Sequence, residues 1–235
     1  MDSFDTEHIA FCFDSRTSKR QKMYPLYKEK RRIREQEATE EERKNKQVFY
    51  DQVQLLRREY LPNIGFKNIF VQGGYEADDI IASLVKNTIL QSGDRAVIIS
   101  SDSDLLQLLE PWCILWNPTK EKTISSLSFQ KEWGISPVQW AEVKAWAGCS
   151  SDSVPGVPGV GEKTAAKYLR GELDPKLKKY KEITNNLGIY THNIKLVRLP
   201  LEGVDTFQFA EDEVTPAKWK KVYDHLARAE KAAMG

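Results

Sequence analysis

The chain has 235 residues, of which 40% are hydrophobic and 29% charged, with a formal net charge of +1. This length suits one large domain or two small ones with a hydrophobic core. No stretch approaches the roughly 18 apolar residues that span a bilayer, and Cys12, Cys113 and Cys149 form neither a CxxC pair nor a disulfide framework. We therefore exclude a membrane-spanning or disulfide-stabilised protein and expect a cytoplasmic one.

The charge is unevenly distributed. Residues 16–34 hold nine Lys/Arg and one acid, residues 163–181 hold seven bases and two acids, and residues 61–155 hold eleven acids and seven bases. An acidic centre between two basic segments suits a metal site that acts on a polyanion. The alternative for each segment is a solvated face.

In chain order, residues 8–13 form an apolar run that ends at Asp14 and predict a buried strand. Residues 23–60 predict one or two charged helices. Strands are expected at residues 68–71 and 96–99. Helices are expected at residues 76–90, with a stop at Gly93, and at residues 102–109. Residues 113–116 and 122–124 are expected to pair as strands. This alternation indicates α/β architecture with a mainly parallel sheet and flanking helices.

The second half of the chain is helical. Helices are predicted at residues 128–133, 137–147, 163–169, 176–187, 189–196 and 216–229. We therefore place a boundary between an α/β domain, residues 1–127, and a helical domain, residues 128–235.

Carboxylates follow the predicted strands. They are Asp14, Glu76, Asp78, Asp79, Asp102 and Asp104. Ligands of open parallel sheets gather at the carboxyl ends of the strands, and six crowded carboxylates require divalent cations. Hard oxygen ligands favour Mg²⁺ or Mn²⁺. The alternative is helix capping, both for Glu76, Asp78 and Asp79 and for Asp102 and Asp104.

A glycine-rich turn, residues 154–161, leads into a predicted helix. Its glycines, Gly156, Gly159 and Gly161, allow backbone amides to face a DNA phosphate at the helix N-terminus. Lys163 and Lys167 lie one turn apart and add positive charge. The segment resembles the hairpin of helix-hairpin-helix motifs, which bind duplex backbone; an ordinary helix-helix turn is the alternative.

Three segments resemble the 5′-nuclease domain of bacterial DNA polymerase I and its bacteriophage relatives, in the 5′→3′ exonuclease and flap-endonuclease family. They are residues 74–81 (GYEADDII), 98–108 (IISSDSDLLQL) and 148–165 (GCSSDSVPGVPGVGEKTA). The likeness is continuous from about residue 9 to residue 169. It implies a PIN/resolvase-like fold with a helical arch, followed by a helix-three-turn-helix region that binds DNA.

The resemblance also implies roles. Asp14, Glu76, Asp78, Asp79, Asp102, Asp104 and Asp152 match metal ligands at two sites. Arg20, Tyr27, Lys28 and Arg31 match the basic-aromatic start of the arch, and Lys28, Arg20 and Arg31 are expected to neutralise the scissile phosphate. Arg16, Lys19, Tyr24 and Tyr27 are expected to contact DNA, although buried packing is an equal alternative for the two tyrosines. Some relatives hold K⁺ at the helix-three-turn-helix.

The sequence departs from the family in two places. Relatives open with a strand that ends in Asp-Gly, and we expect that strand, with one ligand of the first metal, to be absent here. Cys149 stands where an aspartate of the second metal site belongs, and a neutral thiol is a poor Mg²⁺ ligand. The second site is therefore expected to be weakened.

We expect a metal-dependent 5′→3′ exonuclease or 5′-flap endonuclease that hydrolyses branched or 5′-ended DNA, or RNA primers, in a bacterial or phage-infected cell. A monomer is expected, with DNA polymerase or single-strand-binding protein as candidate partners. The alternatives are a branched-DNA-binding relative that no longer cuts, a fragment that needs a separate N-terminal segment, and a ribonuclease with a related acidic fold.

Overall fold

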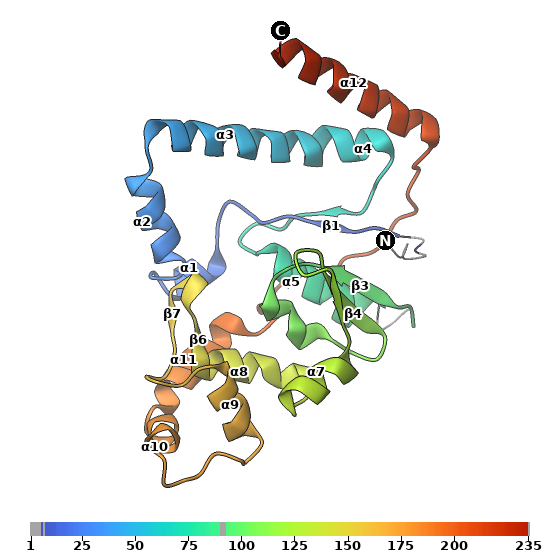
Figure 1. Ribbon diagram of the computed structural model, residues 1–235. Helices are drawn as coiled ribbons and strands as arrows, with labels where there is room; N and C mark the ends of the chain where they lie inside the picture. Colours follow the sequence, from blue (N-terminus) through green and yellow to red (C-terminus); the bar gives the residue numbers. More distant parts are fainter. Residues whose placement is uncertain (1–5, 7, 90–92, 235) are drawn as a thin grey trace. The chain divides into compact units, whose positions relative to one another are not determined.

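The computed structural model describes residue 6, residues 8–89 and residues 93–234 (Figure 1). Contacts between residues divide the chain into two compact units. Unit 1 comprises residues 1–13, 34–71 and 208–235, and unit 2 comprises residues 14–33 and 72–207. No helix within the described ranges is long and apolar enough to cross a membrane.

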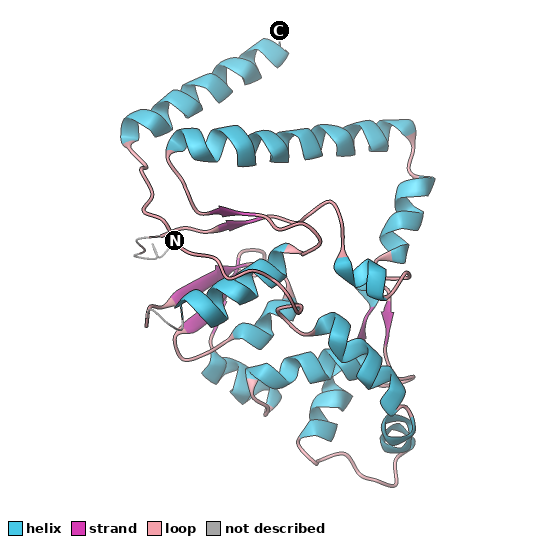
Figure 2. Cartoon of the chain, turned by 180° about the vertical axis from the view of Figure 1, so that it is seen from behind, coloured by secondary structure: helices cyan, strands magenta, loops and turns pink. Residues whose placement is uncertain are grey.

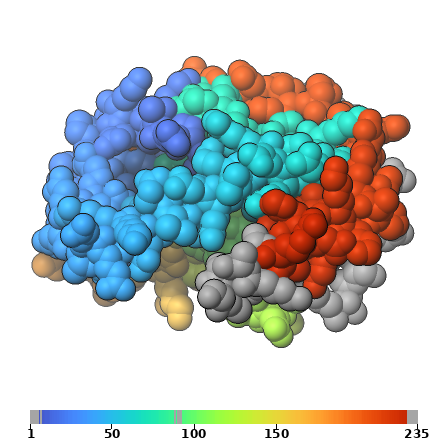
Figure 3. Space-filling view, turned by 90° about the horizontal axis from the view of Figure 1, so that it is seen from above, coloured from blue at the N-terminus to red at the C-terminus, as the bar shows by residue number. Residues whose placement is uncertain are grey.

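Unit 1 joins two short parallel strands to long helices. Its elements are β1 (Phe11–Cys12), α3 (Glu40–Leu55), the π-helix η1 (Leu56–Tyr60), α4 (Leu61–Ile64), β2 (Ile69–Phe70) and α12 (Pro216–Met234). α3 begins at a capping box in which the Thr39 hydroxyl accepts from the Glu42 N–H and the Glu42 carboxylate accepts from the Thr39 N–H. Within its described range α3 buries no residue, and its side chains lie at the surface (Figure 3).

α12 packs against α4 and buries Val222. Asn68 ties the chain before α12 to the β2 region, because its side chain donates to the Ala210 carbonyl and accepts from the Ala210 N–H. Gly65 ends α4 in a left-handed conformation, where a Cβ would lie 2.3 Å from the Glu213 carbonyl oxygen. Only glycine fits there without displacing the backbone.

The first half of unit 2 supplies most of the acids. Its elements are α1 (Lys19–Met23), the start of α2 (Glu29–Glu37), α5 (Ala77–Ser83), the π-helix η2 (Leu84–Ile89), β3 (Ala96–Ile99), the 3-10 helix η3 (Ser103–Leu108), β4 (Cys113–Asn117) and β5 (Lys122–Ile124). β3 pairs with β4 in parallel, and β4 pairs with β5 antiparallel. Figure 2 shows how short the strands are beside the helices.

The second half of unit 2 is mostly helical. Its elements are α7 (Ser126–Trp133), the 3-10 helix η4 (Pro137–Gln139), α8 (Trp140–Ala147), β6 (Gly148–Cys149), the 3-10 helix η5 (Ser150–Asp152), β7 (Val154–Pro155), α9 (Glu162–Leu169), α10 (Lys178–Asn185) and α11 (Leu187–Val197). β6 and β7 form an antiparallel pair. Gly148 and Gly156 permit its close approach, since a Cβ on Gly156 would lie 2.1 Å from the Ala147 carbonyl oxygen.

One hydrophobic core serves both halves of unit 2. It contains Leu105 and Leu115 from the first half, and Phe129, Trp140 and Ile183 from the second. The indole N–H of Trp140 donates to the Ser103 carbonyl at 2.8 Å. The loop that carries two of the acids is therefore anchored to α8.

The predicted hairpin of residues 113–116 and 122–124 is confirmed. The strands of the described ranges form three small sheets rather than one, and a mainly parallel sheet stays a prediction. The segment 102–109 is a 3-10 helix, because Asp102 caps only a short turn before the chain extends at Leu109. The predicted end of helix 76–90, at residue 90, lies outside the described residues. The boundary at residue 127 stays a prediction, although the core just described crosses it.

Candidate metal centre and nucleic-acid interface

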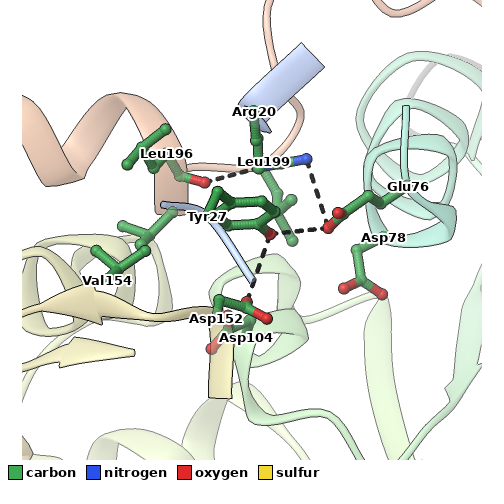
Figure 4. Close-up of a pocket in the computed structure, with 10 residues that line it drawn as sticks. Arg20, Tyr27, Glu76, Asp78, Asp104, Asp152, Val154, Leu196 and Leu199 are labelled. Carbon is green, nitrogen blue, oxygen red and sulfur yellow. Dashed lines mark hydrogen bonds and ion pairs between the residues drawn. The ribbon is translucent and has the colours of Figure 1, made fainter. Parts of the chain in front are cut away.

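Four carboxylates line one pocket of unit 2 (Figure 4). Glu76 precedes α5, Asp78 lies in its first turn, Asp104 lies in η3 and Asp152 ends η5. The pocket is also lined by Arg20, Tyr27, Val154, Leu196, Val197 and Leu199. Segments that are far apart in sequence thus bring these four acids together. Glu76, Asp78 and Asp104 are among the acids that follow the predicted strands, whereas Asp152 was matched only through the family resemblance.

Asp104, Cys149 and Asp152 form the tightest group of metal-ligating atoms within the described residues. One ligand atom from each lies within 4.8 Å of the others. The Cys149 Sγ lies 3.6 Å from Asp152 Oδ2 and 3.0 Å from the Ser151 hydroxyl. Two carboxylates and a thiol are suited to binding a divalent cation.

Burial and the crowding of anions affect the pKa values of two acids in the pocket. Burial, and then the charges of Asp102, Asp14, Glu76 and Asp104, raise the pKa of Asp78 to about 7. Burial also raises the pKa of Asp104, against the opposing effect of Lys144. A cation bound among these oxygens would relieve the repulsion, so the donor set fits a hard divalent metal.

Asp14 and Asp102 border this crevice and also satisfy backbone groups. The exposed Asp14 accepts from the Ala77 N–H at 2.8 Å, and Asp102 accepts from the Asp104 N–H at 2.8 Å. Capping and metal binding are therefore compatible for these two residues, because each cap is formed through a single oxygen.

Asp79 was expected to bind metal and Arg20 to bind the scissile phosphate, but in the structure the two side chains pair with each other. Asp79 is fully buried, and the Arg20 guanidinium binds both of its oxygens at 2.5 and 2.6 Å. The same oxygens accept from the Leu201 N–H at 2.8 Å and the Glu76 N–H at 3.1 Å. Because all of the oxygens' acceptor capacity is used, the structure gives this pair a role in holding α1, α5 and the chain after α11 together.

Tyr27 and Lys28 hold the acids of the crevice in place. The Tyr27 hydroxyl donates to Glu76 at 3.0 Å and lies 3.4 Å from Asp152 Oδ2. Burial and these carboxylates raise the pKa of Tyr27, which keeps it a donor. The Lys28 ammonium pairs with Glu76 at 2.6 Å, and its backbone N–H, at φ +57°, donates to the Asp152 carbonyl at 2.7 Å. Arg31 pairs with Asp152 at 3.0 Å.

The other predicted contacts to DNA are spread over unit 2. Arg16 and Lys19 are exposed, and Lys19 lies over the ring of Tyr75. Tyr24 packs edge-on against His192 and beside the smaller core cluster. Tyr27 is 4% exposed. Burial therefore favours the packing alternative for Tyr27, whereas Tyr24 is half-buried and its contact with DNA stays a prediction.

Lys144 was missed by sequence reasoning. Its side chain is 8% exposed and pairs with Asp104 and with Glu162, each at 3.0 Å. Both carboxylates raise its pKa despite its burial. Lys144 thus links an acid of the crevice to the start of α9. The available signal was a single basic residue among the mostly apolar residues of α8, WAEVKAWA.

One part of the glycine-rich turn packs against the protein, and the other part leaves its backbone exposed. Gly156 packs against α8, whereas a Cβ on Gly159 or Gly161 would meet no atom of the described residues within 4 Å. Gly161 caps α9, and Lys163 and Lys167 are exposed. The open backbone at the α9 N-terminus is accessible to an anion.

Known proteins resemble this chain over most of its length. DNA polymerase I of Mycobacterium leprae (strain TN) is 33% identical over 202 residues, which cover 81% of this chain and 20% of that protein. The 5′-3′ exonuclease of Buchnera aphidicola subsp. Schizaphis graminum (strain Sg) is 36% identical over 139 residues, covering 59% of this chain and 46% of that protein. The chain spans less than half the length of the curated relatives it matches.

Among solved structures, T5 5′-exonuclease with bound divalent zinc ions superposes with a TM-score of 0.72 at 24% identity, covering 90% of this chain and 81% of that one. The fold is therefore an α/β nuclease fold. The family model described as "5'-3' exonuclease, N-terminal resolvase-like domain" matches residues 1–134. The chain belongs to this family of 5′-3′ exonucleases.

Proposed function

We propose that this chain is a metal-dependent 5′→3′ exonuclease and structure-specific 5′-flap endonuclease that hydrolyses phosphodiester bonds of DNA. The observation that carries the proposal is the convergence of Asp78, Asp104 and Asp152 with Glu76 in one pocket. Family membership over residues 1–134 supports the reaction class.

The acids would hold the metal. Asp14, Glu76, Asp78 and Asp102 form one proposed ligand set, and Asp104, Cys149 and Asp152 form the other. When bound, Mg²⁺ or Mn²⁺ supplies an activated water and neutralises charge on the attacking and leaving oxygens. Tyr27 keeps the carboxylates of Glu76 and Asp152 oriented through its hydroxyl.

The basic residues would position the nucleic acid. Lys28 and Arg31 now pair with acids of the crevice, and we propose that they also steer the scissile phosphate there. Arg20 acts as a positioning residue, since its guanidinium is engaged by Asp79. Arg16 and Lys19 would contact the single-stranded 5′ end.

The duplex would be held by the second half of unit 2. We propose a helix-three-turn-helix in which Gly159 and Gly161 expose amides to a backbone phosphate, with K⁺ as a candidate ion, and Lys163 and Lys167 add charge. The two-domain division at residue 127 and a monomeric state belong to the same proposal. DNA polymerase is a candidate partner, because curated relatives are named DNA polymerase I.

A second candidate function is binding of branched DNA without cleavage. The observation that favours it is the Cys149 thiol in place of an oxygen ligand beside Asp104 and Asp152. It predicts flap-DNA binding with no product under any cation.

The two candidates separate in one assay. The purified chain is incubated with a 5′-labelled flap duplex in Mg²⁺, in Mn²⁺ and in EDTA. The nuclease proposal expects short labelled products with either cation and none in EDTA. Flap binding without product in both cations would favour the second candidate.

A further inference from the structure

Cys149 is held rigidly at the edge of the acidic crevice. It is the second residue of β6, it is 8% exposed, and its backbone pairs with Val154 of β7. The close approach of Gly148 and Gly156 permits that pairing, because either Cβ would collide with backbone. The backbone of the residue that carries the thiol is thus fixed by this strand pair.

The direction of the thiol matters because two carboxylates face it. Asp104 comes from η3 and Asp152 from η5, and each offers an oxygen within 4.8 Å of the others' ligand atoms. Lys144 and Arg31 hold these carboxylates from other sides, each at 3.0 Å. Three ligand atoms, one of them sulfur, therefore lie close enough together to bind one cation.

The spacing of the sulfur and oxygen atoms suits a small tetrahedral site. With metal–sulfur and metal–oxygen bonds of about 2.3 and 2.1 Å at a tetrahedral angle, sulfur and oxygen lie about 3.6 Å apart. Cys149 Sγ and Asp152 Oδ2 lie 3.6 Å apart. Mg²⁺ instead requires near-octahedral oxygen ligands at roughly 2.0–2.1 Å, and thiolates favour softer cations.

Building on the proposed function, we infer that Cys149 sets the cation preference of this site, so that Asp104, Cys149 and Asp152 select a thiophilic divalent cation of the Zn²⁺ class over Mg²⁺. The other set of acids keeps its preference for Mg²⁺ or Mn²⁺, because its ligands are all oxygens. Cys149 therefore determines which cation binds at the site formed with Asp104 and Asp152.

The alternative is that Cys149 only fills space in the core. Cys149 belongs to a small cluster with Ala145 and Val154, and buried cysteines commonly act as small apolar residues. A packing cysteine would leave no trace on metal spectra, whereas a ligand would.

Co²⁺ distinguishes these roles, because a cobalt–thiolate bond gives an ultraviolet charge-transfer band. The full chain, kept reduced with a phosphine, is titrated with Co²⁺ as the wild type, Cys149→Ser, Cys149→Asp and Cys12→Ser. The Cys12 variant is the matched control, since that thiol belongs to unit 1. Far-ultraviolet circular dichroism of each variant reports folding.

We expect one saturable band in the wild type and in Cys12→Ser, displaced by stoichiometric Zn²⁺ but retained in a large excess of Mg²⁺. The band should vanish in Cys149→Ser and in Cys149→Asp. A band that persists in a folded Cys149 variant, a wild type without any band, or displacement by Mg²⁺ as readily as by Zn²⁺ would overturn the inference.

Flap cleavage is measured on the same samples, so that the two proposals fail separately. A Cys149-dependent band in a chain that never cuts would uphold the cation site and refute the nuclease. Cleavage in Mn²⁺ without a band would uphold the nuclease and refute the role of Cys149.

Discussion

Two neighbouring carboxylates, Asp78 and Asp79, occupy opposite environments. Asp79 is fully buried and its charge is matched by Arg20. Asp78 is half-buried among other acids, and its pKa is raised to about 7. Burial alone therefore does not distinguish a structural acid from a site acid; the sign of the surrounding charges does.

The largest expected effect comes from removing the paired acid. Asp79→Asn leaves the Arg20 guanidinium buried with a neutral partner, and breaking a buried pair from one side typically destabilises by about 3–5 kcal/mol. Urea unfolding followed by tryptophan fluorescence reports mainly unit 2, which holds five of the six tryptophans. A stability equal to the wild type would remove the structural role assigned to this pair.

Asp78→Asn is the matched variant, and its effect should have the opposite sign. The folded pKa of about 7 lies above the ordinary 3.8. Without metal, the unfolding free energy of the wild type should fall as pH rises from about 4 to about 7 and then level off. At about 1.4 kcal/mol per pKa unit, and discounting for partial exposure, Asp78→Asn should be more stable above pH 7 by roughly 1–3 kcal/mol.

The pH dependence supplies the control for that prediction. Near pH 4 the Asp78 carboxyl is protonated in the folded chain, so the two proteins should unfold at nearly the same urea concentration. An advantage of Asp78→Asn that is equally large at both pH values would mean that the substitution acts through packing rather than through charge.

Lys144→Met tests the bridge that the Lys144 ammonium forms between Asp104 and Glu162. It leaves Asp104 and Glu162 without their shared cation, and partly exposed partners should limit the loss to about 1–2 kcal/mol. Lys163→Met, at an exposed site, is the control and should change stability by less than about 0.5 kcal/mol. Equal chemical denaturation midpoints for Lys144→Met and the wild type would contradict the bridging role.

The smallest effect should appear in binding rather than in folding. Lys163→Ala should weaken duplex binding modestly and lower the slope of log affinity against log salt by about one. The paired Lys28 should have a different signature, since Lys28→Ala mainly slows cleavage of substrates with a free 5′ end. Unchanged salt slopes in fluorescence anisotropy would make Lys163 an ordinary surface residue.

The sequence predicted the positions of the acids better than their partners. Asp14, Glu76, Asp102 and Asp104 could be placed because strand ends are local features, and the hairpin of β4 and β5 followed from alternation and turn residues. The engagement of Asp79 by Arg20 could not be foreseen, because it depends on α1 and α5 meeting across 59 positions of sequence. The same applies to Lys144, which meets Asp104 only after α8 packs on η3.

Single-turnover cleavage of a labelled 5′-flap duplex in Mn²⁺ by the wild type and by Asp78→Asn, with flap binding measured in parallel, tests the metal centre directly. We expect Mn²⁺-dependent cleavage by the wild type. We expect loss of cleavage by Asp78→Asn, with binding kept within several-fold and the fold intact. Equal cleavage rates for the two proteins would contradict a metal centre built on the acids of this crevice.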